Sequence, residues 1–131
     1  MINNTPLYQA VLTGDATAAR SNTEQELAKG ADPLSLVTGQ MTPAMAEVGR
    51  RFESGEFFMP ELLLAARAMK ASMEILRPLL ADCNHNPIGR VVIGTAKGDL
   101  HDVGKNLVGA MMEGGGFEVT DLGVDVSPEA F

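Results

Sequence analysis

The sequence predicts an α + α/β fold, in which a four-helix bundle precedes part of a parallel α/β sheet. Helix start and stop signals recur up to Ala81, and apolar residues in that stretch repeat at helical spacing. After residue 89 the pattern changes to short β-branched runs on either side of one helix-like segment. The predicted domains are a helical domain over 1–83, a linker over 84–89 and the first part of an α/β domain over 90–131.

The composition bounds the class of protein. The 131 residues are 45% hydrophobic and 21% charged, which suits one folded domain or two small modules. A net charge of −7 without a basic stripe argues against binding nucleic acid. The sequence shows neither a signal peptide nor a membrane-spanning run, and its single cysteine, Cys83, excludes an internal disulfide. A cytoplasmic protein that contacts neither nucleic acid nor membrane is expected.

Capping residues mark where the helices of the first domain begin. A side chain able to accept a hydrogen bond from the first-turn amides precedes each predicted start. These side chains are Thr5, Asp15, Asp32 and Thr42. Gly14 and Gly30 mark the ends of the first two helices. Pro43 predicts a break or kink near residues 39–41, because proline has no amide to donate within a helix.

Two apolar stripes predict which helix faces are buried. One steps by 4, 3 and 4 residues and consists of Met41, Met45, Val48 and Phe52. The other continues the same alternation over Leu62, Ala66, Met69, Met73, Leu76 and Leu80. Such spacing places each set on one helix face, and the ordinary interpretation of these stripes is packed core.

The second part predicts strand, helix and strand in that order. Residues 90–96 predict a strand buried on both faces, 102–113 a helix that ends at three glycines, and 117–122 a second strand. This order is typical of a right-handed βαβ unit. Ser127 and Pro128 indicate another helix start. Since two strands leave both sheet edges open, we expect the chain to be the first part of a longer α/β domain.

The segment from Gly98 to Asn106 (GDLHDVGKN) follows the first strand and opens the helix, where parallel sheets bind ligands. It is not a phosphate-binding P-loop, because five residues rather than four separate its glycines and Asn106 follows the lysine where Ser or Thr is needed. His101-Asp102 matches the dipeptide of metal-dependent phosphohydrolases. That site needs more histidines than His85, the only other one in the chain.

Asp99, His101 and Gly104 form the candidate site. A loop histidine can bind a transition metal through one ring nitrogen, while a carboxylate two residues earlier accepts the proton on the other. Gly104 permits a large group to approach. One histidine without further protein ligands suits an axial ligand to a metal that a macrocycle already holds. The alternative is that Asp99 and His101 only cap the following helix.

One motif and two longer strings resemble a known family. The motif Asp99-Leu-His101-Asp-Val-Gly104 matches the D-x-H-x-x-G signature of cobalamin-binding proteins. The string GTAKGDLHDVGKNLVGAMMEGGGFEVTDLGVDVSPE resembles corrinoid proteins of methyltransferase systems and the cobalamin module of methionine synthase. Residues 48–62, VGRRFESGEFFMPEL, resemble the helical cap domain of those proteins. The resemblance extends over nearly the whole chain, to Phe131.

The resemblance implies a four-helix cap over a Rossmann-like domain, with cobalamin or a related corrinoid between them. In that family the cofactor's own base is displaced and a protein histidine binds the cobalt from below. By resemblance this metal ligand is His101, supported by Asp99, with Gly104 as the third cofactor-binding residue of the motif. The cap residues implied to face the upper side of the corrin are Phe52, Met59 and Leu62. Each of these three also fits plain bundle core.

The implied function is that of a corrinoid methyl carrier. A donor-specific methyltransferase would methylate Co(I), and an acceptor methyltransferase would move the methyl group from methyl-Co(III) to a tetrahydrofolate or a thiol. A reductive activation protein is a further implied partner. The chain is a subunit of such a system and is not expected to catalyse alone.

Three related functions are alternatives. A cobalamin-binding regulatory sensor is disfavoured by the acidic charge, since sensors of this family carry a basic DNA-binding region ahead of the cap. A subunit of an adenosylcobalamin mutase generally lacks the helical cap, whereas a fragment of methionine synthase shares both motifs. Family members continue with Ser-x-Leu and Gly-Gly motifs that line a slot for the nucleotide tail. Neither motif can be placed before Phe131, so truncation within the α/β domain is expected.

Overall fold

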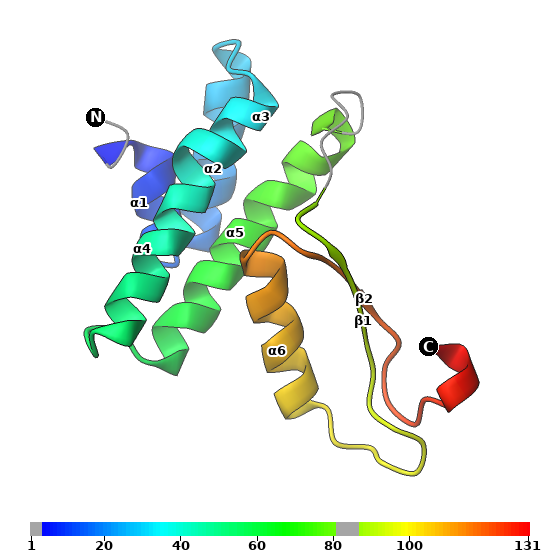
Figure 1. The fold of residues 1–131 in the computed structure, drawn as a ribbon. Helices are drawn as coiled ribbons and strands as arrows, with labels where there is room; N and C mark the ends of the chain where they lie inside the picture. Colours follow the sequence, from blue (N-terminus) through cyan, green and yellow to red (C-terminus); the bar gives the residue numbers. More distant parts are fainter. Residues whose placement is uncertain (1–3, 81–86) are drawn as a thin grey trace. The chain divides into compact units, whose positions relative to one another are not determined.

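The computed structural model describes residues 4–80 and 87–131, and the chain divides into two compact units, Met1–His85 and Asn86–Phe131 (Figure 1). We refer to them as the helical unit and the α/β unit. Within the two described ranges, no helix combines the length and the apolar composition needed to cross a membrane.

The described residues of the helical unit, 4–80, form five α-helices. They are α1 (Pro6–Leu12), α2 (Ala16–Ala28), α3 (Pro33–Leu36), α4 (Thr42–Glu53) and α5 (Met59–Leu80). The side chains of Thr5, Asp15 and Asp32 each accept a hydrogen bond from an amide in the first turn of the helix that follows. The three corresponding helix starts are therefore confirmed.

The predicted cap at Thr42 is wrong. Thr42 has helical backbone angles, φ −61° and ψ −45°, and its amide donates to the carbonyl of Val37. A π-helical turn, Val37–Met41, joins α3 to α4, so the chain stays helical across the predicted break. The wider turn accommodates Pro43, which has no amide to donate. The proline thus marks a disturbance of the helix and not a new start.

Both predicted stripes contribute to the core of the helical unit. Met41 and Val48 are fully buried, and every member of the second stripe is buried except Met73, which is half-buried. Helix α5 runs beside the other helices of the unit and packs against α1, α2 and α4 (Figure 1). Between α2 and α5, the buried hydroxyls of Thr23 and Ser72 lie 2.9 Å apart and share a hydrogen bond.

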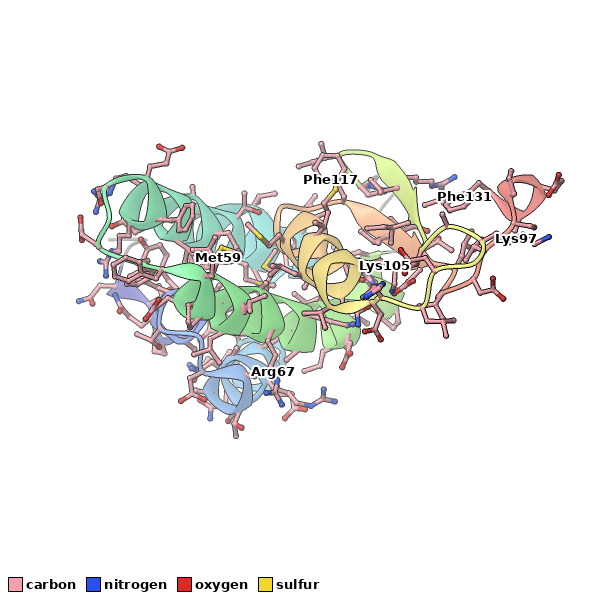
Figure 2. The ribbon with its side chains drawn as sticks, turned by 90° about the horizontal axis from the view of Figure 1, so that it is seen from below. Met59, Arg67, Lys97, Lys105, Phe117 and Phe131 are labelled. Atoms are coloured by element: carbon pink, nitrogen blue, oxygen red, sulfur yellow. The ribbon has the colours of Figure 1, made fainter. Side chains whose placement is uncertain are left out.

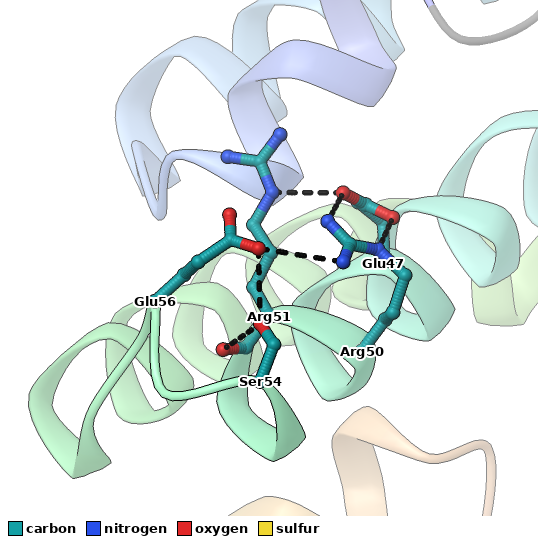
Figure 3. Close-up of polar contacts among 5 residues, drawn as sticks. All are labelled: Glu47, Arg50, Arg51, Ser54 and Glu56. Carbon is teal, nitrogen blue, oxygen red and sulfur yellow. Dashed lines mark hydrogen bonds and ion pairs between the residues drawn. The ribbon is translucent and has the colours of Figure 1, made fainter.

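A charged network fixes the turn between α4 and α5, residues 54–58, which we call the α4–α5 corner (Figure 3). Glu47 accepts hydrogen bonds from the guanidinium groups of Arg50 and Arg51, each at 2.8 Å. The guanidinium carbon of Arg51 lies 5.3 Å from the centre of the Phe57 ring. The Arg51 carbonyl also accepts two amides of the corner. The entry into α5 is therefore held by both charge and backbone contacts.

The α/β unit has the predicted order of strand, helix and strand. Strand β1 (Arg90–Ile93) pairs in parallel with β2 (Glu118–Asp121), and helix α6 (Val103–Gly114) connects them (Figure 1). An isolated bridge between Ala96 and Val126 continues the pairing beyond both strands.

Two details of the α/β unit differ from the prediction. Strand β1 is not buried on both faces, since Val92 stays exposed. The described residues supply one crossover helix for a two-stranded sheet, which leaves side chains uncovered. The predicted helix after Ser127 is only a 3-10 turn, Pro128–Ala130, without a side-chain cap.

Candidate functional site

The loop between β1 and α6 presents a histidine to solvent. The side chain of His101 is 97% exposed, and its Nδ1 lies 2.5 Å from Oδ1 of Asp99. The same carboxylate oxygen accepts the backbone amide of His101 at 3.0 Å. Asp99 therefore holds one side of the ring, and Nε2 is the ring nitrogen that remains for another ligand.

Asp99 and His101 shift each other's pKa. The backbone amide of His101, and then its ring, hold the pKa of the Asp99 carboxyl below its ordinary value. The hydrogen bond to Asp99 raises the pKa of the His101 imidazole. A carboxylate in this position favours a ring that carries its proton on Nδ1.

The helix-capping interpretation of Asp99 and His101 does not describe the contacts of this loop. Helix α6 begins at Val103, and Asp102 occupies its N-cap position without a side-chain hydrogen bond. The Asp99 carboxylate binds His101 instead. Its contacts are those of a residue that orients a histidine.

Residues that the sequence did not predict hold the His101 loop in place. The Thr95 hydroxyl donates to the carbonyl of His101 at 2.7 Å, and the Asp125 carboxylate accepts a loop amide at 2.8 Å. The side chain of Lys105, on the first turn of α6 (Figure 2), is 8% exposed, and its Nζ lies 2.6 Å from the Asp121 carboxylate. Asp121 and Asp125 come at the end of β2 and just after it. Because parallel strands end at one edge, this placement is the signal that could have found them.

The His101 loop is open to solvent and exposes two apolar side chains among its charged ones. Leu100 and Val103, the nearest apolar neighbours in the sequence, are 72% and 80% exposed. A Cβ atom added to Gly104 would meet no heavy atom within 4 Å. Apolar surface beside a single nitrogen ligand suits a large metal complex better than a bare ion.

A multi-ligand metal site is not found in the part of the chain that the structure describes, since no three His, Cys, Asp or Glu side chains come together there. His85, the further histidine that the phosphohydrolase alternative would need, lies outside that part. The chemistry of His101, with Asp99 behind it, fits the axial ligand of a metal that arrives inside a macrocycle such as a corrin.

The three predicted cap residues differ in their exposure. Phe52, near the end of α4, and Met59, the first residue of α5 (Figure 2), are 39% and 36% exposed. Leu62 is buried and belongs to the core of the helical unit. Phe58, which its sequence pattern did not mark as a site residue, is exposed at the α4–α5 corner. Phe52, Phe58 and Met59 thus form a group of exposed apolar side chains at the corner and its two ends.

Comparison with known protein families matches both units. A family model described as a B12 binding domain matches residues 4–77, and a second with the same description matches residues 89–131. One chain of the solved methanol:cobalamin methyltransferase complex from Methanosarcina barkeri aligns over 92% of this chain and 46% of its own length, with a TM-score of 0.80 and 30% identity. The monomethylamine corrinoid protein of the same organism aligns with 95% of this chain and 58% of its own, with a TM-score of 0.59 and 34% identity.

Curated relatives carry related names. Trimethylamine corrinoid protein 1 of Methanosarcina acetivorans is 40% identical over 93% of this chain and 57% of its own length. Monomethylamine corrinoid protein 1 of Methanosarcina mazei is 36% identical over 94% of this chain and 58% of its own length. The chain thus spans little more than half the length of these relatives. Since the first family model alone covers more than half of this sequence, the chain belongs to the B12-binding family of corrinoid proteins.

Proposed function

We propose that this chain is the cofactor-carrying part of a corrinoid methyl carrier, which shuttles a methyl group between two methyltransferases. The observation that supports it most directly is the exposed ring of His101, whose Nδ1 is engaged by Asp99 while Nε2 is available for a metal. A bound corrinoid supplies the methyl-transfer chemistry through its cobalt. The chain supplies the metal ligand, its orientation and an apolar surface.

His101 is the proposed lower ligand of cobalamin in its base-off form, in which the cofactor's own base is displaced. Asp99 holds the proton on Nδ1, so that the lone pair on Nε2 can bind the metal. Gly104 carries no side chain that would block the approach of the corrin ring. The residues proposed for the opposite face of the corrin are Phe52 and Met59, whose side chains are partly exposed, whereas Leu62 packs in the core of the helical unit.

The Asp99–His101 pair also handles a proton. Were His101 free of the metal, its Nε2 would take up a proton from solvent, and the Asp99 carboxylate would stabilise the resulting imidazolium. The raised pKa of His101 favours this uptake. Release of the ligand would thereby be coupled to protonation of the ring.

The proposed partners follow from the kinds of protein that this chain resembles. Relatives named for trimethylamine and monomethylamine, and a structural neighbour from a methanol methyltransferase complex, support a donor-specific methyltransferase as one partner. An acceptor methyltransferase that uses a tetrahydrofolate or a thiol, and a reductive activation protein, complete the proposed system in the cytoplasm. The chain would not catalyse methyl transfer without them.

Isotope-edited electron paramagnetic resonance tests the metal ligand. The chain is mixed with excess cobalamin, and the cobalt is reduced to Co(II). The unpaired electron of Co(II) couples to the nuclear spin of an axial nitrogen. Labelling only the histidines of the protein with ¹⁵N should change that splitting, because the axial nitrogen is then the protein's and not the cofactor's. His101→Ala should abolish the effect of the label.

Asp102→Asn is the matched control, because it alters the neighbouring side chain, which makes no cap hydrogen bond. This variant should keep the label-dependent splitting. Two results would contradict the assignment of His101 as the metal ligand. One is a nitrogen splitting that is the same with and without the ¹⁵N label, and the other is a label effect that remains in His101→Ala.

A further inference from the structure

Two segments run side by side at the carboxyl edge of the sheet: the His101 loop after β1 and residues 121–126 at the end of β2. Their backbones pair beyond the strands, since the amide of Thr95 donates to the carbonyl of Gly123 and the amide of Val126 donates to the carbonyl of Thr95, both at 2.9 Å. The segment after β2 is therefore a fixed support for the loop that carries the histidine.

Asp125 makes two hydrogen bonds to the His101 loop. Its Oδ1 accepts the amide of Gly98 at 2.8 Å, and its own amide donates to the carbonyl of Asp99 at 3.1 Å. The two contacts fall on consecutive residues, so they fix the direction in which the chain enters Asp99. The Asp99 carboxylate then holds Nδ1 of His101. A continuous chain of contacts thus runs from Asp125 to the ring.

The backbone of Asp125 is held in an unusual conformation. Its φ is 54°, and no other residue except glycine has a positive φ in the described ranges. Asp and Asn adopt this region more readily than other side chains do, yet it persists only where the surroundings impose it. Here the Lys105–Asp121 ion pair holds one end of the segment, and the Ala96–Val126 bridge holds the other.

We propose that Asp125 is a positioning residue for His101, acting through the backbone and carboxylate of Asp99. Its carboxylate orders the turn at Gly98, and that order keeps Asp99 against Nδ1 so that Nε2 faces outward. The inference rests on the proposed role of His101 as a metal ligand. It adds a residue from the second strand's loop to the determinants of that ligand's geometry.

Asp125→Gly and Asp125→Asn separate the carboxylate contact from the backbone conformation. Both residues tolerate the positive φ, but only Asn keeps an oxygen acceptor for the Gly98 amide. NMR of the cofactor-free chain gives two readouts: the exchange rate of the Gly98 amide, and the ¹⁵N shifts of the neutral His101 ring, which report its tautomer. In the natural chain we expect a protected Gly98 amide and a ring protonated mainly on Nδ1.

Asp125→Gly should speed exchange of the Gly98 amide about tenfold and move the ring toward the Nε2–H tautomer. Asp125→Asn should preserve both readouts, and Glu129→Gln, which removes another carboxylate of the same unit, should change neither. Amides of β1 and β2 show whether the sheet remains folded in each variant.

Several results would overturn the proposal. One is fast exchange of the Gly98 amide in the natural chain, a test that can be made without any variant. Another is a tautomer that stays the same in Asp125→Gly, and a third is an Asn variant that behaves like the Gly variant. Because no cofactor is present, failure here is distinct from failure of the cobalt ligand assignment, which the His101→Ala spectrum decides.

Discussion

The Asp99–His101 pair determines how the loop responds to pH. Asp99 has a pKa below its ordinary value of 3.8, so its contribution to stability is present above that value and is lost as pH falls through the folded pKa. His101 has a pKa above its ordinary value of 6.5, so its contribution is present below 6.5 and is lost as pH rises through the folded pKa. Between these values both groups are charged and the pair is at full strength.

The charge of Asp99 should be visible in the titration of His101. Asp99→Asn keeps the size of the side chain but removes the charge that stabilises the imidazolium. In the cofactor-free chain, the pKa of His101 should fall toward its ordinary range. NMR titration of the ring measures it, with Glu129→Gln as a charge control that should leave it in place. If His101 titrates at the same pH with Asn as with Asp, the carboxylate does not act on the ring.

The sequence could predict Asp99 and His101 because their contact is local. The side chains of two residues in the same turn are brought together by the short backbone between them, so their spacing in the sequence is enough to predict the contact. Asp125 could not be predicted in this way, since it lies 27 residues from its partner Gly98. Their contact depends on strand register and on a positive φ, neither of which spacing reveals.

Gly14, between α1 and α2, lies so close to α5 that the position has no room for a side chain. Its φ is +73°, and an added Cβ would lie 2.5 Å from the Cβ of Leu64 and 2.9 Å from its carbonyl carbon. Gly14→Ala should therefore lower the free energy of unfolding by about 3 kcal/mol, the sum of left-handed strain and overpacking. Urea unfolding followed by circular dichroism measures the change.

Gly30 provides the matched control for this prediction. It also has a positive φ, +90°, but an added Cβ would meet nothing within 4 Å. Gly30→Ala should cost only the backbone strain, about 1 kcal/mol. If both variants lost the same free energy of unfolding, contact with Leu64 would not be the reason for a glycine at position 14.

The charged network at the α4–α5 corner should make the helical unit sensitive to acid. Hydrogen bonds from Arg50, and then Arg51, lower the pKa of Glu47 from 4.5 to about 2. The stabilisation is present above 4.5 and is lost as pH falls toward 2. The melting temperature should therefore drop across this window, and Glu47→Gln should flatten that drop. Glu53→Gln, on the same helix, should leave the drop in melting temperature unchanged. If the drop persists in Glu47→Gln, this network is not its cause.

Elements that depend on local hydrogen bonds were predictable, whereas those that depend on the surroundings were not. The starts at Thr5, Asp15 and Asp32 need only a side chain and the next turn. Thr42 has the same local signal, but α3 continues through a π turn into α4 and leaves no amide for it to cap. The exposure of Val92 likewise depends on which helices cover the sheet, and the sequence of strand β1 does not contain that information.

The two units bury very different amounts of apolar surface. The core cluster consists entirely of residues of the helical unit. Among the described residues of the α/β unit, Val126 is the one buried apolar side chain. Two parallel strands also expose an outer edge each. Because apolar burial is the main favourable term in folding, the helical unit should be much the more stable.

Hydrogen exchange should resolve this difference within one chain. Amides in the middle of α5 should open only with unfolding of the helical unit, whereas amides of α6 and β1 should open at a free energy lower by about 3 kcal/mol or more. Gly14→Ala links the measurement to the architecture, because its clash lies wholly within the helical unit. It should lower the opening free energy of α5 and leave that of α6 unchanged, since α6 already opens by a separate route. If α5 and α6 instead share one opening free energy, and Gly14→Ala lowers both equally, then the two units unfold as a single cooperative body and the smaller unit draws its stability from the larger.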